Sequence, residues 1–203
     1  MTLPRGLYGM VDTGAPLPPH AQLDVLLRAG CRVMQVRAKG ESADARRSLV
    51  RALVPAARAS GALLLVNDDI DAAAHADGVH LGQEDAPPAA ARARLGPRAL
   101  IGWSTHTAGQ VEDARGAVDY IGFGPVFGTA TKDTGYAPRG VAALADAVAR
   151  FGGPVVAIGG IGEGDLPALQ AAGAWCWAVI GGVWGAPDPL LAARRFASAG
   201  SGR

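Results

Sequence analysis

Short apolar runs alternate along this chain with Ala- and Arg-rich stretches of helical periodicity, and the alternation repeats eight times. The runs are four to six residues long with few polar interruptions, which is typical of strands buried on both faces of a parallel sheet. Strands are predicted at Leu7–Val11, Arg32–Val36, Ala62–Val66, Gly78–Leu81, Leu100–Trp103, Tyr120–Phe123, Val155–Ile158 and Trp177–Ile180. Helices are predicted at 20–29, 42–59, 69–75, 87–94, 107–115, 138–150, 163–172 and 187–198.

Eight strand–helix units in 203 residues leave about 25 residues for each unit, which is sufficient for a closed (β/α)8 barrel, the TIM barrel. A doubly wound open sheet uses similar units, but the number of units favours closure. No linker-like stretch divides the chain. We therefore expect one α/β domain over residues 1–203, with a flexible tail over 197–203.

Charge and composition limit the partners of the protein. The net charge is only +1, so no basic surface for nucleic acid is predicted. The sequence has no apolar stretch of 18 residues and no signal-like apolar start, so we expect no membrane partner and a cytoplasmic location. Cys31 and Cys176 are too few and too far apart for a metal motif or a disulfide framework, and both are interpreted as small buried hydrophobic residues.

Polar residues directly follow three consecutive strands. Gln35, Arg37 and Lys39 alternate at the end of the second strand, Asn67–Asp69 follow the third, and Gly82–Asp85 follow the fourth. The carboxyl ends of the strands of a parallel barrel meet at one mouth, so these side chains are expected to converge. Arg and Lys together suit a diphosphate, and Mg²⁺ is usually held by one or two carboxylates plus phosphate oxygens.

Simpler interpretations of these clusters stay open from the residues alone. Lys39 would begin a turn at an ordinary solvated strand end, and Asp68 or Asp85 would cap the helix that follows it. We favour Asp68 and Asp85 as a Mg²⁺ pair because they follow neighbouring strands. Asp69 and Glu84 are expected to point away from the mouth, toward helix N-termini or solvent.

The second half of the chain adds three features at strand ends. Ser104 follows the fifth strand without a G-x-S-x-G elbow around it, so we expect it to contact a ligand rather than to act as a nucleophile. The loop over 124–135 is rich in Gly and Thr and carries Lys132, so it either covers a phosphate or is a plain surface loop. Glycine pairs at 159–160 and 181–182 follow the last two strands, where barrels often bind phosphate through backbone N–H groups. The mouth is therefore predicted to hold two anions.

Six ordered motifs, spread over nearly the whole chain, resemble the thiamine-phosphate synthase family. They are Q-x-R-x-K at 35–39, N-D at 67–68, A-D-G-V-H-L-G-Q-E-D at 76–85, G-x-S-T-H at 102–106, G-P-V-F-x-T-x-T-K at 124–132 and I-G-G-I at 158–161. This resemblance implies a TIM-barrel transferase of thiamine biosynthesis that joins 4-amino-2-methyl-5-(diphosphooxymethyl)pyrimidine to 4-methyl-5-(2-phosphoethyl)thiazole. The products would be thiamine phosphate and pyrophosphate, formed by a dissociative, Mg²⁺-assisted mechanism.

The resemblance also implies a role for each matching residue. The pyrimidine diphosphate would be bound by Gln35, Val36, Arg37, Ala38, Lys39, Asn67, Ser104 and Lys132. The thiazole phosphate would be bound by Thr129, Ala130, Thr131, Gly160, Ile180 and Gly181. Arg37, Lys39 and Lys132 would act in catalysis by stabilising the departing pyrophosphate, and Asp68 and Asp85 would bind Mg²⁺. A homodimer is a further expectation from the family.

Two departures and two other functions accompany this interpretation. Gly181 stands where the family often has Ser, and Gly128 stands where Pro is common. A thiazole tautomerase that resembles this family would share the barrel and the glycine phosphate site, but Pro125 and Asp85 favour the synthase. A non-catalytic protein that binds a thiamine precursor would not need two metal-binding carboxylates.

Overall fold

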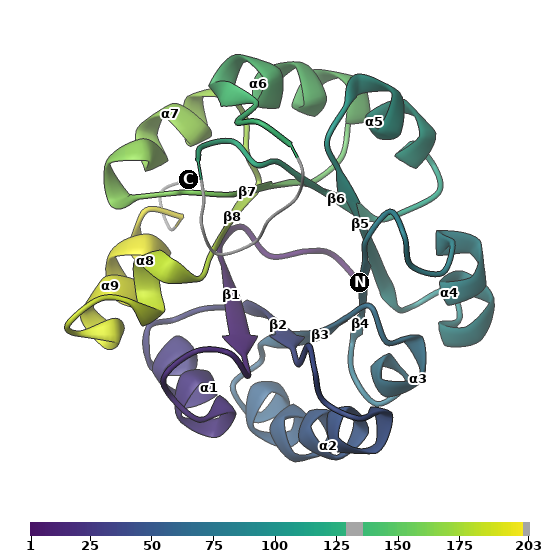
Figure 1. Ribbon diagram of the computed structural model, residues 1–203, viewed down its shortest axis with the longest axis vertical. Coiled ribbons are helices and arrows are strands. Elements are labelled where there is room, and N and C mark those ends of the chain that lie inside the picture. The colour runs from purple at the N-terminus through teal and green to yellow at the C-terminus, as the bar shows by residue number, and fades with distance from the viewer. Residues whose placement is uncertain (129–135, 201–203) are drawn as a thin grey trace.

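The computed structural model describes residues 1–128 and 136–200, and its centre is a closed barrel of eight parallel strands ringed by helices (Figure 1). Each strand pairs with the next, and β8 pairs with β1 to close the sheet. The strands are β1 (Gly6–Asp12), β2 (Val33–Arg37), β3 (Leu63–Asn67), β4 (Gly78–Leu81), β5 (Leu100–Thr105), β6 (Tyr120–Phe123), β7 (Val155–Ile158) and β8 (Cys176–Val179). The predicted TIM barrel is confirmed, and closure excludes the open doubly wound sheet.

The helices pack on the outside of this barrel. They are α1 (Pro19–Arg28), α2 (Ala43–Ala59), α3 (Ile70–Ala73), α4 (Pro88–Leu95), α5 (Ala108–Ala114), α6 (Gly140–Phe151), α7 (Leu166–Ala171), α8 (Gly181–Trp184) and α9 (Pro189–Ser198), with a 3₁₀ turn at Glu163–Asp165. Within the described ranges, none of these helices has the length and apolar character needed to span a bilayer.

Two helices differ from the sequence prediction. The helix predicted over 69–75 is the single turn α3, because the Asp69 side chain caps it by accepting from the Ala72 N–H and the chain must reach β4 by Gly78. The short helix α8 was not predicted, and Gly181 and Gly182 were interpreted only as a phosphate-binding glycine pair after the last strand. Two glycines in a four-residue helix give almost no sequence signal, since Gly is a poor helix former.

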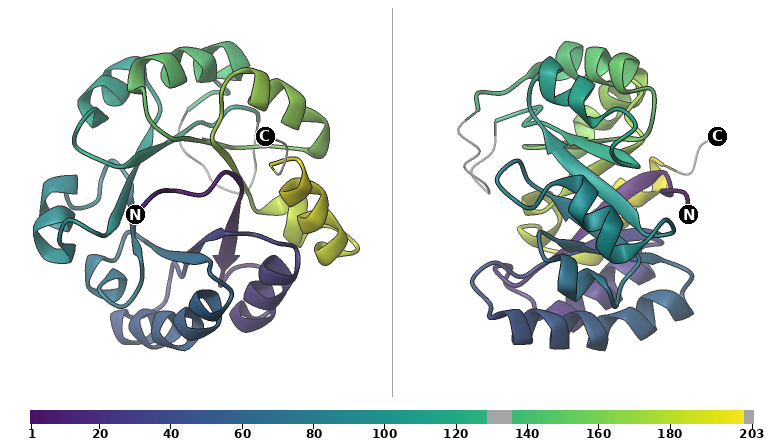
Figure 2. Two further views of the ribbon diagram at one scale, coloured as in Figure 1. Left: turned by 180° about the vertical axis from the view of Figure 1, so that it is seen from behind. Right: turned by 90° about the vertical axis from the view of Figure 1, so that its right-hand side faces the viewer.

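Side chains alternate along each strand between two apolar cores. In β1, Leu7 and Val11 face outward and pack with the helices, whereas Tyr8 and Met10 face the barrel interior. Leu3, which precedes β1, is buried in the same interior cluster, and its carbonyl accepts from Trp175 Nε1 at 2.8 Å. The N-terminal segment thus crosses the amino-terminal end of the barrel and closes it (Figures 1 and 2). The carboxyl-terminal ends of the strands form the other, open end.

Candidate active site

A cavity of about 170 Å³ lies at the carboxyl-terminal mouth of the barrel. Its lining combines apolar side chains of the interior core, exposed glycine backbone and polar side chains from the strand ends. Seven of the residues that the sequence indicates line it: Gln35, Arg37, Asn67, Ser104, Gly160, Ile180 and Gly181. These residues come from five different strands or the turns after them, so the closed barrel brings together what the sequence separates.

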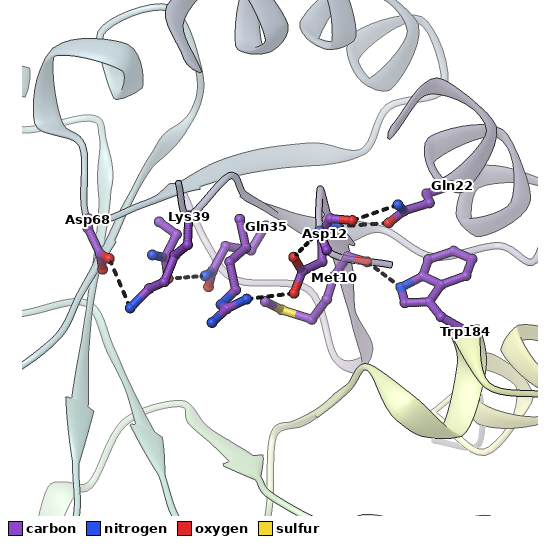
Figure 3. A network of polar contacts seen from close by, with 10 residues as sticks. Met10, Asp12, Gln22, Gln35, Lys39, Asp68 and Trp184 are labelled. Carbon is purple, nitrogen blue, oxygen red and sulfur yellow. Dashed lines mark hydrogen bonds and ion pairs between the residues drawn. The ribbon is translucent and has the colours of Figure 1, made fainter. Parts of the chain in front are cut away.

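A second cavity adjoins the first beyond the ends of β2 and β3. Ala38, Lys39 and Asp68 line it, and Asn67 is shared between the two cavities. Lys39 Nζ lies 3.8 Å from Asp68 Oδ2, with 53% of the Lys39 side chain and 32% of the Asp68 side chain exposed (Figure 3). The cation at the end of β2 and the carboxylate at the end of β3 therefore meet at the mouth.

The remaining residues indicated by the sequence fall elsewhere. Val36 is buried in the outer core, so its side chain faces the helices and not the cavity. Asp85 follows β4 as an exposed residue, and its Oδ2 accepts from the Gly82 N–H at 2.6 Å. It does not cap α4, because the residue in the N-cap position is Pro87. The remainder lie outside the described residues: Thr129, Ala130, Thr131 and Lys132.

Arg37 is held by Asp12, a carboxylate that the sequence interpretation did not single out. Arg37 Nη1 donates to Asp12 Oδ2 at 2.8 Å, and the two side chains are 20% and 6% exposed (Figure 3). Asp12 is itself fixed, because Oδ1 accepts from the Gly14 N–H and the Gln22 side-chain amide bonds to both its backbone N–H and its carbonyl. Asp12 is the last residue of β1, so the pattern of polar residues at strand ends could also have indicated it as a site residue.

A chain of polar side chains, all buried except the half-buried Asn67, crosses the barrel interior just below the mouth. We call it the inner network, and its members in order are Asn67, Gln35, Tyr8, Tyr120, His80 and Ser104. In its first half, Gln35 Nε2 donates to Asn67 Oδ1 at 2.7 Å and Tyr8 Oη donates to Gln35 Oε1 at 2.9 Å. The Tyr8 and Tyr120 hydroxyl oxygens lie 2.9 Å apart.

His80 joins the second half of the inner network. Its Nδ1 lies 3.0 Å from Tyr120 Oη, and its Nε2 lies 2.9 Å from Ser104 Oγ. Burial raises the pKa of both Tyr8 and Tyr120 well above the ordinary value, so both phenols keep their protons. Sequence reasoning missed Tyr8, Tyr120 and His80, whose inward positions emerge only once the face of each strand is known.

The glycines after β7 have both conformational and steric reasons to be glycine. Gly159 and Gly160 have φ angles of 100° and 62°, which side chains rarely adopt. A Cβ on Gly160 would also lie 2.2 Å from the Gly128 carbonyl oxygen. Gly160 and Gly181 therefore present bare backbone to the cavity, and Gly181 begins α8, where the first N–H groups have no partner inside the helix.

The side chains that the sequence indicates for a metal ion, Asp68 and Asp85, offer carboxylate oxygens as donors. Among the described residues, no group of three or more His, Cys, Asp or Glu side chains converges as a ligand cluster. Asp68 and Asp85 follow neighbouring strands, and hard oxygen donors of this kind, few in number, fit Mg²⁺ completed by phosphate oxygens. Asp68 also has a φ of 64°, and such strain at a non-glycine residue is often found at ligand sites.

Comparison with known proteins agrees with this fold and site. The family model described as thiamine monophosphate synthase matches residues 7–183. A thiamine-phosphate synthase of Anaeromyxobacter dehalogenans is 45% identical over 201 residues, with 96% of this chain and 87% of the relative covered. One from Chlorobium luteolum is 44% identical over 197 residues, with 96% and 93% covered. A solved thiamine phosphate pyrophosphorylase from Pyrococcus furiosus is similar at a TM-score of 0.86 and 30% identity, with 96% and 94% covered. The chain therefore belongs to the thiamine-phosphate synthase family, whose members are transferases of thiamine biosynthesis.

Proposed function

We propose that this protein couples 4-amino-2-methyl-5-(diphosphooxymethyl)pyrimidine to 4-methyl-5-(2-phosphoethyl)thiazole, forming thiamine phosphate and pyrophosphate. The observation that carries the proposal is one mouth with two different surfaces that each suit an anion. Arg37 and Lys39 offer cations at one place, and Gly160 and Gly181 offer bare backbone at another. The inner network lies between the strand ends that carry them, where an aromatic ring would sit.

The cationic surface would bind the diphosphate of the pyrimidine. Arg37 presents a planar guanidinium whose position is fixed by Asp12, and Lys39 supplies a second charge that is half exposed. Gln35, Asn67 and Ser104 are polar groups of the cavity wall and would contact the pyrimidine itself. The Val36 and Ala38 assignments concern backbone between these side chains and stay predictions.

Asp68 and Asp85 would hold Mg²⁺, together with oxygens of the diphosphate. A carboxylate accepts up to four hydrogen bonds, so the contact of Asp85 with the Gly82 N–H leaves acceptor capacity for a cation. When bound, Mg²⁺ would supply charge neutralisation on the leaving pyrophosphate. Lys39 lies 3.8 Å from Asp68, so the cation of the chain and that of the metal would act on the same leaving group.

The thiazole phosphate would lie on the glycine surface. Backbone N–H groups at Gly160 and Gly181 suit a phosphate, and at Gly160 the positive φ and the crowding that a Cβ would meet require glycine. Loss of a hydroxyl at position 181 relative to much of the family leaves the backbone as the donor there. Thr129, Ala130, Thr131 and Lys132 stay predictions for this phosphate and for the pyrophosphate.

The mechanism that fits these groups is dissociative. Cationic side chains stabilise the departing pyrophosphate, the aminopyrimidine delocalises the positive charge left behind, and the thiazole nitrogen attacks. Ser104 and His80 resemble a nucleophile–base pair at 2.9 Å, but the group that orients the other nitrogen of His80 is the neutral phenol of Tyr120. Catalysis would therefore rest on positioning and electrostatic stabilisation.

The test follows both products with both precursors present. We expect thiamine phosphate and pyrophosphate in equal amounts, and neither with one precursor alone. Arg37→Gln should raise the KM for the pyrimidine diphosphate by roughly tenfold or more, the loss expected for one charged hydrogen bond. Arg32→Gln is the matched control, because Arg32 precedes β2 at the closed end and is exposed. Turnover of the thiazole phosphate alone would support the tautomerase instead, and tight binding without turnover would support a non-catalytic role.

Two further expectations go with this proposal. A cytoplasmic location would suit an enzyme whose two cysteines are both buried thiols. A homodimer is expected from the family resemblance, and sedimentation of the purified protein would test it.

A further inference from the structure

We propose that the inner network has a single hydrogen-bond direction, from Ser104 to Asn67, and that this direction selects an aminopyrimidine over an oxopyrimidine. Tyr8, Tyr120 and His80 are then positioning residues, since each acts on the ligand through the residues at the two ends. The inference rests on the proposed function, because it names what fixes the identity of the pyrimidine.

The two phenols set the direction at the centre. Each hydroxyl has one proton to donate. Tyr8 donates its proton to Gln35 Oε1, so it can only accept from Tyr120 across their 2.9 Å contact. Tyr120 therefore donates its hydroxyl hydrogen bond to Tyr8, and its oxygen accepts one from His80 Nδ1 at 3.0 Å. The raised pKa of both phenols supports this assignment, because neither loses its proton near neutral pH.

The direction then fixes what Ser104 offers to a ligand. A neutral imidazole that donates through Nδ1 accepts through Nε2. Ser104 Oγ lies 2.9 Å from His80 Nε2, so the serine hydroxyl donates its hydrogen bond to this ring nitrogen. Ser104 lines the cavity and is 8% exposed. Its oxygen presents only lone pairs to the cavity, and the ligand must bring an N–H or O–H donor there.

The other end of the network offers the opposite group. Gln35 uses Oε1 to accept from Tyr8 and donates Nε2 to Asn67 Oδ1 at 2.7 Å. The carbonyl oxygen of Asn67 is thus engaged, and its side-chain N–H₂ is the group left for the cavity that it lines. A ligand must place an acceptor against it.

A 4-aminopyrimidine brings both of the groups that these two requirements call for. Its exocyclic amino group donates and its ring nitrogen accepts, whereas the 4-oxo analogue has a carbonyl acceptor and a ring N–H donor in the reverse order. The carbonyl oxygen of the oxo analogue would face the lone pairs of Ser104, and its ring N–H would face the N–H₂ group of Asn67. Sites that pair a substrate's polar groups by hydrogen bonds reject the mismatched analogue by about 10⁴-fold or more, and we expect at least roughly 10³-fold here.

The first experiment determines the direction of the hydrogen bonds in the inner network and does not depend on turnover. Nitrogen-15 chemical shifts of the His80 ring, measured in the free wild-type protein at neutral pH, should report a neutral ring protonated on Nδ1. A ring protonated on Nε2, or a doubly protonated imidazolium, would overturn the proposal, because Ser104 would then be free to donate to the ligand.

The second experiment measures the ratio of kcat/KM for the aminopyrimidine and the oxopyrimidine diphosphates. Tyr120→Phe removes the link between His80 and Tyr8, and we expect the ratio to fall at least roughly tenfold. Thr105→Val is the matched control, because it removes a buried hydroxyl that donates to the Gly122 carbonyl at 3.1 Å outside the inner network. The ratio does not depend on the folded fraction of a sample, so a merely structural role for Tyr120 would leave it unchanged and would overturn the proposal.

Failure of the proposed function and misfolding of a variant can each be told apart from failure of the proposed hydrogen-bond direction. If wild-type protein forms no thiamine phosphate, the proposed function fails, and the ring shifts of His80 still decide the direction of the network. If Tyr120→Phe does not fold, Tyr8→Phe breaks the same chain one step further along and takes its place in the ratio measurement with the same expected result.

Discussion

Replacing Asp12 by Asn tests whether the barrel orients Arg37 for the diphosphate or simply supplies its charge. In the native protein, Asp12 Oδ1 accepts from the Gly14 N–H at 2.9 Å, and Oδ2 accepts from Arg37 Nη1 at 2.8 Å. An asparagine has one oxygen for these two donors. It can keep the turn at Gly14, but its amide N–H₂ then faces the guanidinium, donor against donor.

The magnitude follows from the burial of the pair. Breaking a fully buried ion pair costs about 3–5 kcal/mol, and exposed pairs contribute about 0.2–1 kcal/mol. With Asp12 6% exposed and Arg37 20% exposed, we expect a loss of about 2 kcal/mol in the free energy of unfolding. If the same interaction positions Arg37 for the diphosphate, the KM for the pyrimidine diphosphate should rise roughly 30-fold, which is the factor for 2 kcal/mol.

The assay pairs urea unfolding with steady-state kinetics. Asp24→Asn is the matched control, because Asp24 pairs with Arg28 at 3.4 Å on the exposed face of α1, with both side chains about 60% exposed. We expect the control to change stability by less than about 0.5 kcal/mol and to leave the KM unchanged. An Asp12→Asn enzyme that binds the diphosphate as tightly as wild type, or more tightly, would refute the positioning role. Tighter binding would mean that Asp12 only neutralises Arg37.

Three further outcomes are expected. Asp85→Ala should lower turnover by roughly 100-fold or more, the effect of losing one group that stabilises developing charge, and near-normal turnover in Mg²⁺ would exclude Asp85 as a ligand. Burial by itself raises the pKa of Asp69, but the Ala72 N–H and Arg46 lower it more, so the folded pKa lies below the ordinary 3.8. The stability that the Asp69 charge contributes should be full above pH 3.8 and lost as the pH falls below it. Urea unfolding of wild type and Asp69→Asn across this range checks the effect, which an unchanged difference in stability at every pH would contradict. Burial raises the pKa of the Cys31 thiol to about 11 and raises that of Cys176 as well, so neither should react with a thiol reagent at pH 8 before unfolding. Rapid labelling of native protein would show that this burial is wrong.

The barrel could be predicted from sequence because its strands are short, continuous and apolar. The same property prevented part of the site from being predicted. In a closed barrel, both faces of a strand are buried, so apolar character does not reveal which side chains face the interior. Tyr8, His80 and Tyr120 fall inside predicted strands, and none of the three was predicted to belong to the site. Closure of the sheet places all three in one hydrogen-bonded chain.

Strand ends were predicted less well, for a related reason. The first strand was predicted to end at Val11, yet Asp12 is the last residue of β1 and pairs in register with Arg37. A charge at a strand end is tolerated when a neighbouring strand supplies its partner, and that pairing is known only from the tertiary structure. In contrast, Gln35 and Arg37 follow from a period of two along a single strand, and both line the cavity.

The most direct test of the central claim is coupling of the two phosphorylated precursors by the purified protein, with Mg²⁺ and with EDTA, following thiamine phosphate and pyrophosphate together. We expect both products in equal amounts when Mg²⁺ is present, and their loss when EDTA removes it. Equal turnover in EDTA would contradict the roles of Asp68 and Asp85, and no product from folded protein in Mg²⁺ would contradict the proposed reaction.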